Sequence, residues 1–502
     1  MSSLDPLTYS LRRSFAVGDR RALALLVGGL LLLPLIGAAL VVGVHPVVAV
    51  ALPLALVAAA LLLRTPMWGL YGVIAVAVLL PFAALPFSIG FKPTFLDVMV
   101  GASFFVWFMT LLAGRARGLR FAPFSLLIVI FVAIALAAFV GGLQHAALDK
   151  QTLRRFVELL LGVGIFFVVV DYVRSREQLA ALALLLMWCG FGSALIGILL
   201  YLLPHELSNQ LLNQLTRFDY PGGFVLRFIL DDPALNQRAI STSVDPNVFG
   251  GLLIMLTAFT APQIAAERPL LPRGLAILMT GTMGLALALT FSRGSMAGLV
   301  VALTPLILLR YRWLLPYAVV GVLLLLLLPQ AQDYIGHFIA GVRGEDLATQ
   351  MRFGEYKDAL RLIQRYPWLG VGFSGAPDID LYVGVSSVYL LIASQMGLIG
   401  LTAYLLVLAA FFLFVIGSLR RIRRRTTLAE PLLLGGASAI FGAAFAGIFD
   451  HHFFDVAFPH FATLFWLLMG VAVAARYVAM ADHADSAAPH ANPLSALWDG
   501  AV

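Results

Sequence analysis

The chain has 502 residues, of which 61% are hydrophobic and 12% are charged, and its mean hydropathy is +0.96. Soluble domains carry roughly 45–50% apolar and about 25% charged residues, so the composition excludes a disordered chain and argues against a soluble enzyme. A membrane-spanning helix needs about 20 mostly apolar residues. The composition therefore predicts an all-α, polytopic membrane helical bundle with about 12–14 transmembrane helices.

Apolar runs between charged residues mark where these helices are expected. In chain order the runs cover residues 22–43, 47–63, 68–83, 95–113, 123–140, 153–172, 179–203, 247–265, 274–291, 295–309, 313–329, 385–417, 431–449 and 459–476. We expect residues 1–480 to form a single transmembrane helical domain. The polar residues 481–502 are expected to form a disordered cytoplasmic tail.

The distribution of charge predicts the orientation of the chain. If the N-terminus is cytoplasmic, the inner segments are short and basic, as in Arg115–Arg117, Arg310–Arg312 and Arg420–Arg425, whereas the outer segments hold more acidic than basic residues. This is the positive-inside bias, and it predicts that both termini are cytoplasmic. The same bias accounts for the net charge of +7, so no nucleic-acid partner is expected.

Two outer loops are much longer than the others, at about 204–246 and about 330–384. Loops longer than about 12–15 residues are usually functional or disordered. The second loop contains residues 345–365, in which apolar residues recur at helical spacing, acidic residues come first and arginines come last, before Pro367. This pattern predicts an amphipathic helix along the outer membrane surface, with Trp368 as an interfacial anchor.

Arginines on the outer side are informative because topology disfavours them there. A guanidinium group binds phosphate oxygens bidentately and stays charged, so several of them together at the membrane boundary would bind a lipid-linked phosphate or diphosphate. The alternative is that each pairs with an outer acid or a lipid headgroup. Among the outer arginines, Arg293 has the strongest case for a functional role. It lies in a four-residue turn between two spans, where little water solvates a cation. The other outer arginines include Arg154, Arg155, Arg217, Arg227, Arg238, Arg352, Arg361 and Arg365.

Several outer polar residues are candidates for acid–base chemistry. Asp245 precedes Pro246 and Asn247 at the start of a span, which is ordinary helix-capping chemistry, but a carboxylate there could also act as a base. Asn247 could bond sugar hydroxyls. Histidine can accept a proton near neutral pH or bind a diphosphate when protonated, which makes His337 and His451 candidates. The segment Asp450–Asp455 offers metal-ligand side chains, but no second ligand cluster supports it, so no metal site is expected.

Four segments between about 235 and 416 resemble the O-antigen ligase and O-antigen polymerase superfamily of polytopic membrane glycosyltransferases. They are Asp245–Gly251, Thr290–Gly294, Arg352-x-x-x-Tyr356 with Tyr366–Phe373, and Tyr389–Gly400. The chain departs from the ligase branch at one position. Ser387, Leu390 and Gly397 fit that branch's pattern, but Ser386 stands where the branch has a histidine.

The resemblance implies a metal-independent glycosyltransferase without a cofactor. It would transfer glycan from an undecaprenyl-diphosphate donor to an acceptor sugar on the periplasmic face of a bacterial inner membrane. The missing histidine favours polymerisation of O-antigen or exopolysaccharide repeats. One alternative is a ligase that transfers polymer to lipid A–core, and an alternative from another class is a transporter or flippase of lipid-linked glycans.

The resemblance also implies partners and roles. Expected partners are the lipid-linked donor, an acceptor glycan or lipid A–core, membrane lipids and a chain-length regulator. The diphosphate would bind Arg293 and Arg352, with Arg238 as the third arginine. Asp245, His337 and Glu355 are the candidates for the catalytic base. Further site candidates are Asn247, Ser386 and His451.

Overall fold

Helices make up almost all of the regular structure in the computed structural model. It describes residues 66–88, 90–112, 118–316, 319–320, 347–375, 385–422 and 428–487. Eight helices in these ranges are long and apolar enough to cross a membrane, which confirms the all-α polytopic bundle. The described residues belong to one compact unit that begins at Pro66. The spans expected at 22–43 and 47–63, and most of the one at 313–329, lie outside the described residues.

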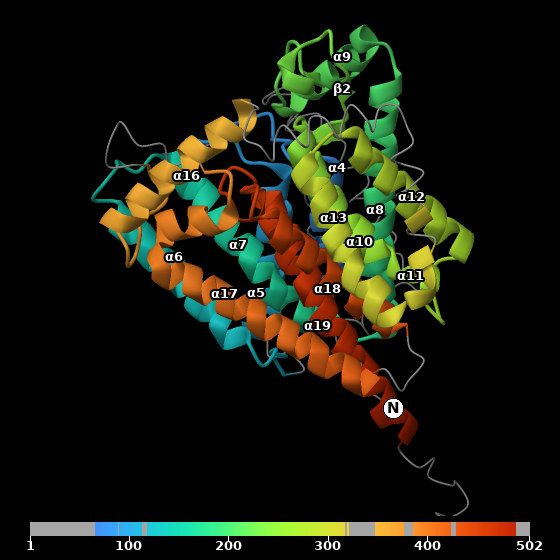
Figure 1. The fold of residues 1–502 in the computed structure, drawn as a ribbon. Coiled ribbons are helices and arrows are strands. Elements are labelled where there is room, and N and C mark those ends of the chain that lie inside the picture. The colour runs from blue at the N-terminus through green and yellow to red at the C-terminus, as the bar shows by residue number, and fades with distance from the viewer. Residues whose placement is uncertain are drawn as a thin grey trace, which may run out of the picture. The chain divides into compact units, whose positions relative to one another are not determined.

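Three helices form the centre of the bundle (Figure 1): α10 (Pro246–Thr260), α18 (Ala429–Ala446) and α19 (Pro459–Ala487). Nearly all residues of α10 and α18 are buried, and α19 packs on α18 and on α7 (Lys150–Tyr172). Helix α19 continues beyond residue 480, because the segment that was expected to be disordered begins with good helix formers such as alanine.

Small residues bring α13 (Arg293–Pro305) close to the central helices. A Cβ atom on Gly442 of α18 would lie 2.6 Å from the Cβ of Ala302 and 2.9 Å from the carbonyl oxygen of Gly298, both on α13. Small residues at such contacts let helix backbones approach closely, which is the usual packing of helices in membranes. The beginning of α13 is thereby fixed beside the beginning of α10 and the end of α18. We call this end of the bundle the outer end, because the segments predicted to be outer meet there.

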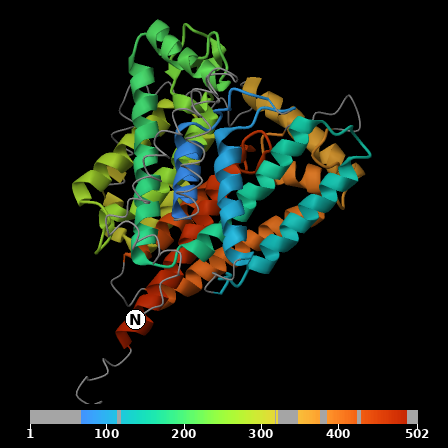
Figure 2. The same cartoon turned by 180° about the vertical axis from the view of Figure 1, so that it is seen from behind.

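The remaining long helices surround this centre. The reverse view shows α4 between α8 and α5 (Figure 2), and these three helices pack in that order. Exposed side chains on these surrounding helices are large and apolar, for example Phe105 and Phe108, as expected where helices face lipid. The surrounding helices are α4 (Met67–Leu79), α5 (Phe95–Leu112), α6 (Ser125–Gly142), α8 (Arg176–Leu202) and α12 (Arg273–Leu289). Short helical segments α11 (Pro262–Ala265), η4 (Leu306–Arg310) and η5 (Arg312–Leu314) connect the helices at the opposite end.

The first large loop folds into a small cap beyond the end of α8 (Figure 1). Its strands β1 (Arg227–Phe228) and β2 (Gln237–Arg238) pair antiparallel, so that Arg227 lies opposite Arg238. A separate apolar cluster that includes Leu212, Phe228 and Ile240 holds the cap together. The other elements of the cap are α9 (His205–Asn213), η1 (Gln214–Phe218), η2 (Ile229–Asp231) and η3 (Ser241–Ser243).

The second large loop contains the expected amphipathic segment as α16 (Leu347–Arg365). After α16, residues 366–373 pack on a break in α17 (Val388–Ile422), where Gly397 has a φ of 68°. The break frees backbone groups: the amide of Val371 donates to the carbonyl oxygen of Ser394 at 2.8 Å, and the amide of Leu398 donates to that of Pro367 at 2.7 Å. A Cβ on residue 397 would lie only 2.0 Å from the carbonyl oxygen of Trp368, so this position requires glycine.

Candidate active site

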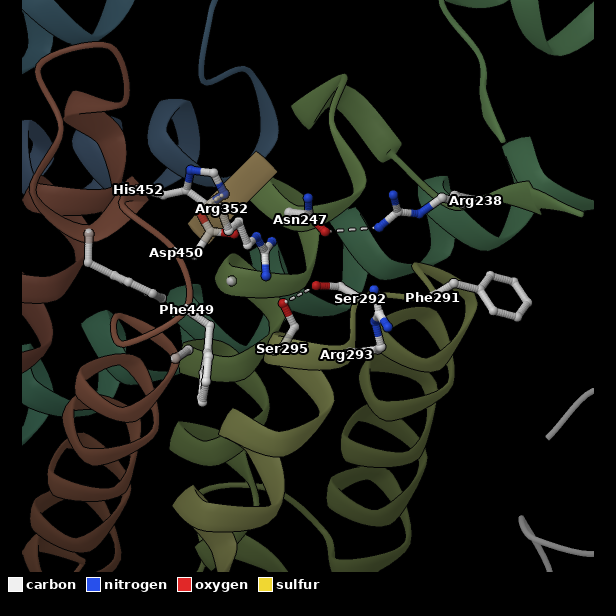
Figure 3. A pocket seen from close by; sticks show the side chains of 14 residues that line it. Arg238, Asn247, Phe291, Ser292, Arg293, Ser295, Arg352, Phe449, Asp450 and His452 are labelled. Atoms are coloured by element: carbon white, nitrogen blue, oxygen red, sulfur yellow. Dashed lines mark hydrogen bonds and ion pairs between the residues drawn. The ribbon is translucent and has the colours of Figure 1, made fainter. Parts of the chain in front are cut away.

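A cavity of about 130 Å³ lies at the outer end of the bundle, and three arginines line it. They come from β2, from the first residue of α13 and from α16, which are far apart in the sequence. Figure 3 shows Arg238 beside Asn247 on one side of the cavity, Arg352 beside Asp450 and His452 on the other, and Arg293 near Ser292. The structure therefore brings together Arg238, Arg293, Arg352 and Asn247, all of which the sequence singles out.

Arg238 is held by two neutral groups. Its Nε donates to the carbonyl oxygen of Thr290 at 2.8 Å, and its Nη2 donates to Oδ1 of Asn247 at 2.9 Å. The ribbon of β1 and β2 places Arg238 over the cavity, and Asn247 is in the first turn of α10. These two hydrogen bonds orient the guanidinium group of Arg238 at the cavity.

Arg293 begins α13, directly after a turn in an unusual conformation. Phe291 has a φ of 52°, in the left-handed region, which costs on the order of 1–3 kcal/mol for a residue other than glycine. The hydroxyls of Ser292 and Ser295 lie 2.9 Å apart and line the cavity with Arg293. The amide groups at a helix N-terminus attract anions, so α13 adds to the positive potential that Arg293 creates.

Buried His452 and partly buried Asp450 form a pair opposite these arginines. Nε2 of His452 lies 2.9 Å from Oδ1 of Asp450. Burial raises the pKa of Asp450, but the positive charges of His452, His451 and Arg352 lower it more, to about 2. Burial lowers the pKa of His452, but the negative charge of Asp450, with smaller effects from Asp245 and Asp455, raises it above its usual value. The pair therefore favours a protonated imidazole on the wall of the cavity.

His451 shares Asp450 with His452 and also contacts Asp455. Its Nδ1 lies 3.4 Å from Oδ1 of Asp450 and its Nε2 lies 3.4 Å from Oδ2 of Asp455. Burial and the charge of His452 lower its pKa. Asp450, His451 and His452 each place one ligand atom within 4.8 Å of the others, a spacing that a metal ion can bridge. The nearby charge of Arg352 opposes a cation there and favours an anion instead.

Asp245 caps a helix and also lines a cavity. Its Oδ1 accepts hydrogen bonds from the amides of Asn247 at 2.7 Å and Val248 at 3.0 Å, so it caps α10. Its side chain also lines a second cavity, which adjoins the arginine cavity. Val244, the preceding residue, has a φ of 62° and lines the same second cavity. Asp245 therefore holds the first turn of α10 and faces the second cavity at the same time.

Glu355 and Ser386 contact each other rather than the cavity. The hydroxyl and the amide of Ser386 donate to Oε2 of Glu355 at 2.7 and 2.9 Å, and the hydroxyl of Tyr356 donates to the carbonyl oxygen of Ser386 at 3.1 Å. The contact joins α16 to the beginning of α17 and so helps to position Arg352. His337 lies outside the described residues.

Sequence reasoning missed Asp450 and His452 as cavity residues. The sequence predicted His451, from the same segment, as the site histidine. In the structure, the turn η6 (His452–Phe454) directs the next residue, His452, into the cavity. In a turn, neighbouring side chains point in different directions, so the backbone conformation decides which histidine faces the site. The sequence signal that could have indicated these residues is the presence of two acidic residues and two histidines in one short outer segment.

Comparison with known proteins supports the resemblance. Residues 278–405 match the family model described as O-antigen ligase, and this range contains Arg293, Arg352 and Gly397. No curated protein matches the chain. Arg238 and His452 lie outside the matched range but line the first cavity with Arg293 and Arg352 from inside it, whereas Asp245 lines the second cavity. The matched segment and the apolar helical bundle together support the similarity of this chain to the O-antigen ligase and polymerase superfamily of polytopic membrane proteins.

Proposed function

We propose that the protein is a glycosyltransferase that takes glycan from an undecaprenyl-diphosphate donor and adds it to an acceptor sugar. The observation that carries the proposal is the meeting of three arginines from three separate segments in one cavity. The cavity lies at the end of the bundle where the segments predicted to be outer meet. We therefore assign the reaction to the periplasmic face of the inner membrane, with both chain termini in the cytoplasm.

The arrangement accounts for the chemistry that the transfer requires. The acceptor hydroxyl attacks C1 of the donor sugar, the bond between C1 and the phosphate oxygen breaks, and the electron pair leaves with the lipid diphosphate. Arg238, Arg293 and Arg352 stabilise the charge that develops on the diphosphate, as preorganised donors do in other transfer enzymes. Protonated His452 adds a further positive charge to the same wall.

The proton of the acceptor hydroxyl needs a base, and Asp245 is in the best position to be one. Its carboxylate lines the second cavity, while Asn247, two residues later, lines the arginine cavity. An acceptor in the second cavity would therefore present its hydroxyl to Asp245 and to a donor sugar next to the arginines. Glu355, whose Oε2 accepts two hydrogen bonds from Ser386, would have to release that contact first.

A polymerase is favoured over a ligase by residue 386. The ligase branch has a histidine at this position, whereas Ser386 here is engaged with Glu355 and joins two helices. A transporter is less well supported. Transporters place broken helices and charges near the middle of the membrane, whereas in the part of α17 that the structure describes the break at Gly397 lies near the outer end.

The proposal is tested by comparing cavity and surface arginines in a strain that lacks the chromosomal copy. Arg293→Ala and Arg352→Ala should each reduce polymer formation by about 10²–10³-fold, the usual effect of removing one preorganised donor. Arg361→Ala is the matched control, because Arg361 lies exposed on the same helix as Arg352 and pairs with Asp358. The readouts are the glycan ladder and the amount of protein in the membrane.

The ladder of the deletion strain separates the alternatives. Single repeats on lipid A–core indicate a lost polymerase, and full-length polymer that remains on undecaprenyl diphosphate indicates a lost ligase. Accumulation of lipid-linked repeats on the cytoplasmic face would indicate a flippase. Full-length glycan in both cavity variants, at normal protein abundance, would refute the diphosphate site.

A further inference from the structure

Four arginines gather at the inner end of the bundle, which is the end opposite the two cavities and the one where α17 and α19 finish (Figure 1). We call Arg120, Arg174, Arg421 and Arg476 the inner arginine cluster. Arg120 lies in the loop before α6, Arg174 lies between α7 and α8, Arg421 is near the end of α17, and Arg476 is on α19. The charge of Arg174 acts on Arg120, and the charge of Arg421 acts on Arg476, so the members of each pair are close in space.

Aromatic side chains hold the two pairs of this cluster together. The hydroxyl of Tyr477 on α19 donates to the carbonyl oxygen of Phe121 at 2.8 Å, which ties α19 to the loop that carries Arg120. The ring of Tyr477 also packs edge-on against Phe414 of α17, and the guanidinium group of Arg476 lies 4.6 Å from the centre of that same ring. The charges of both Arg120 and Arg476 act on Tyr477, which therefore lies between them.

The carboxylate of Asp171 lies at this cluster, and both of its oxygens are already occupied. Asp171 is 5% exposed. Its Oδ1 accepts from Nη2 of Arg174 at 2.5 Å and from the backbone amide of Arg120 at 3.3 Å. Its Oδ2 accepts from Nε1 of Trp107 at 3.0 Å. Asp171 thus neutralises Arg174, whereas the Arg120 side chain forms no ion pair within the part of the chain that the structure describes.

Two arginines of the cluster have donors that the protein does not pair. Nη1 of Arg120 and Nε of Arg476 are buried and have no hydrogen-bond partner among the described residues. Burial and the positive charge of Arg174 lower the pKa of Arg120, so nearby groups compensate its charge incompletely. Buried donors are nearly always paired in proteins. These two therefore indicate an anionic partner that the described part of the chain does not supply.

The surface around Arg120 is suited to a lipid. Leu119 and Phe121, on either side of Arg120 in the chain, are 44% and 55% exposed. Arg120 and Arg476 are themselves partly exposed, so a headgroup can reach them. The loop joins the spans α5 and α6, which places it where the hydrocarbon ends and the phosphate groups of lipids lie. Basic pockets between membrane helices on the cytoplasmic side are typical sites for anionic headgroups.

We propose that the inner arginine cluster binds the phosphate headgroup of an anionic phospholipid of the inner leaflet. Arg120 and Arg476 donate to the phosphate oxygens from the two sides of Tyr477, and the acyl chains lie against Leu119 and Phe121. The headgroup supplies the anion that Asp171 cannot, and it joins α19 to the loop before α6. This site is at the opposite end of the molecule from the cavities, so it does not depend on the proposed reaction.

The test measures lipid binding to the purified full chain in detergent by native mass spectrometry, without any glycan substrate. The probes are phosphatidylglycerol and phosphatidylcholine with the same acyl chains, which differ in the net charge of the headgroup. We expect the wild type to bind phosphatidylglycerol with a Kd at least about tenfold lower than phosphatidylcholine. Arg120→Gln with Arg476→Gln should remove this preference.

Matched variants separate a site from the general attraction of basic segments to anionic lipids. Arg268→Gln with Arg312→Gln removes two exposed arginines of segments predicted to be inner, outside the cluster, so this pair should keep the wild-type preference. Arg120→Lys with Arg476→Lys keeps the charges but loses the forked donors, so it should bind phosphatidylglycerol more weakly than the wild type. The lysine pair keeps the test decisive if the glutamine pair does not fold, which the thermal unfolding temperature reports.

Three results would overturn the inference. They are equal affinity of the wild type for both lipids, wild-type affinity in both cluster variants, and the same loss of preference in the control pair. Inorganic phosphate should not displace the bound lipid, and displacement would assign the site to a free anion instead. Because the assay contains no donor and no acceptor, its failure leaves the proposed glycosyl transfer untouched, and a protein that transfers no glycan could still bind this lipid.

Discussion

The two cavities share a wall but hold their positive charge in different ways. In the first cavity, three arginines and His452 line the wall with one acidic side chain, Asp450, which contacts His452. In the second, larger cavity, carboxylates neutralise two of the four basic side chains. A small cavity with concentrated charge suits a diphosphate, whereas a larger one with mixed charge suits a glycan with one anionic group. The difference supports the proposal that the leaving group binds in the first cavity and the acceptor in the second.

The largest effect is expected at the wall, where Asp245 has two roles that substitution can separate. Asparagine caps a helix about as well as aspartate, so Asp245→Asn should keep the fold but lose the base. Because a general base contributes about 10²–10⁴-fold, we expect transfer to fall by that factor. Asp245→Ala should lose the same activity and also about 1 kcal/mol of stability through the cap. Initial rates of glycan transfer and the thermal unfolding temperature are the measurements. If Asp245→Asn retains full activity, Asp245 is only a cap.

A smaller effect, dependent on pH, is expected from His452 in the first cavity. The negative charges of Asp450, Asp245 and Asp455 raise the pKa of this histidine, so the protonated form is present below that raised value and is lost as the pH rises through it. Activity that needs the charge should therefore fall at alkaline pH, by up to about tenfold per pH unit.

The pH–rate profile of His452→Gln is the measurement for this histidine. The alkaline limb should disappear in the variant, and the remaining activity should be low at every pH. Asp450 does not produce this limb, because its pKa of about 2 keeps it ionised over the whole range. His451, whose pKa is lowered, gives the control: His451→Gln should keep the alkaline limb. Persistence of the limb in His452→Gln would assign it to another group.

The smallest effect is expected from Gly397, which acts on the first cavity from a distance. Gly397→Ala adopts a left-handed conformation, which costs on the order of 1–3 kcal/mol, and its Cβ also forces the backbone of Trp368 to shift. The strain should loosen the packing of residues 366–373 on α17 and so displace α16, which carries Arg352. Donor KM should rise while acceptor KM stays the same. Gly354→Ala on α16, where a Cβ would meet no atom within 4 Å, is the control.

Part of this architecture could be predicted from the sequence, because topology and composition leave local signals. Apolar runs predicted the helices, and the amphipathic pattern predicted α16. Outer arginines were singled out because the positive-inside bias disfavours them, and three of them do meet in one cavity. The turn of Arg293 was visible because only a few residues separate two apolar runs.

The rest depends on contacts between distant segments, which no local pattern records. Arg238 reaches the cavity only because β2 pairs with β1 inside the first large loop, and the sequence predicted neither strand. The second cavity combines Lys92, Arg155 and Arg227 from three separate segments, and which of these cations is neutralised depends on their three-dimensional neighbours. The choice of His452 over His451 depends on the conformation of a single turn.

The central claim is that the first cavity binds the diphosphate leaving group, and binding can be measured without any turnover. The purified full chain in nanodiscs is titrated with undecaprenyl diphosphate and with undecaprenyl monophosphate, for the wild type, Arg293→Ala and the control Arg361→Ala. The account predicts that the wild type and Arg361→Ala bind the diphosphate at least about tenfold more tightly than the monophosphate, and that Arg293→Ala loses this preference. Equal binding of the diphosphate by the wild type and Arg293→Ala would contradict it.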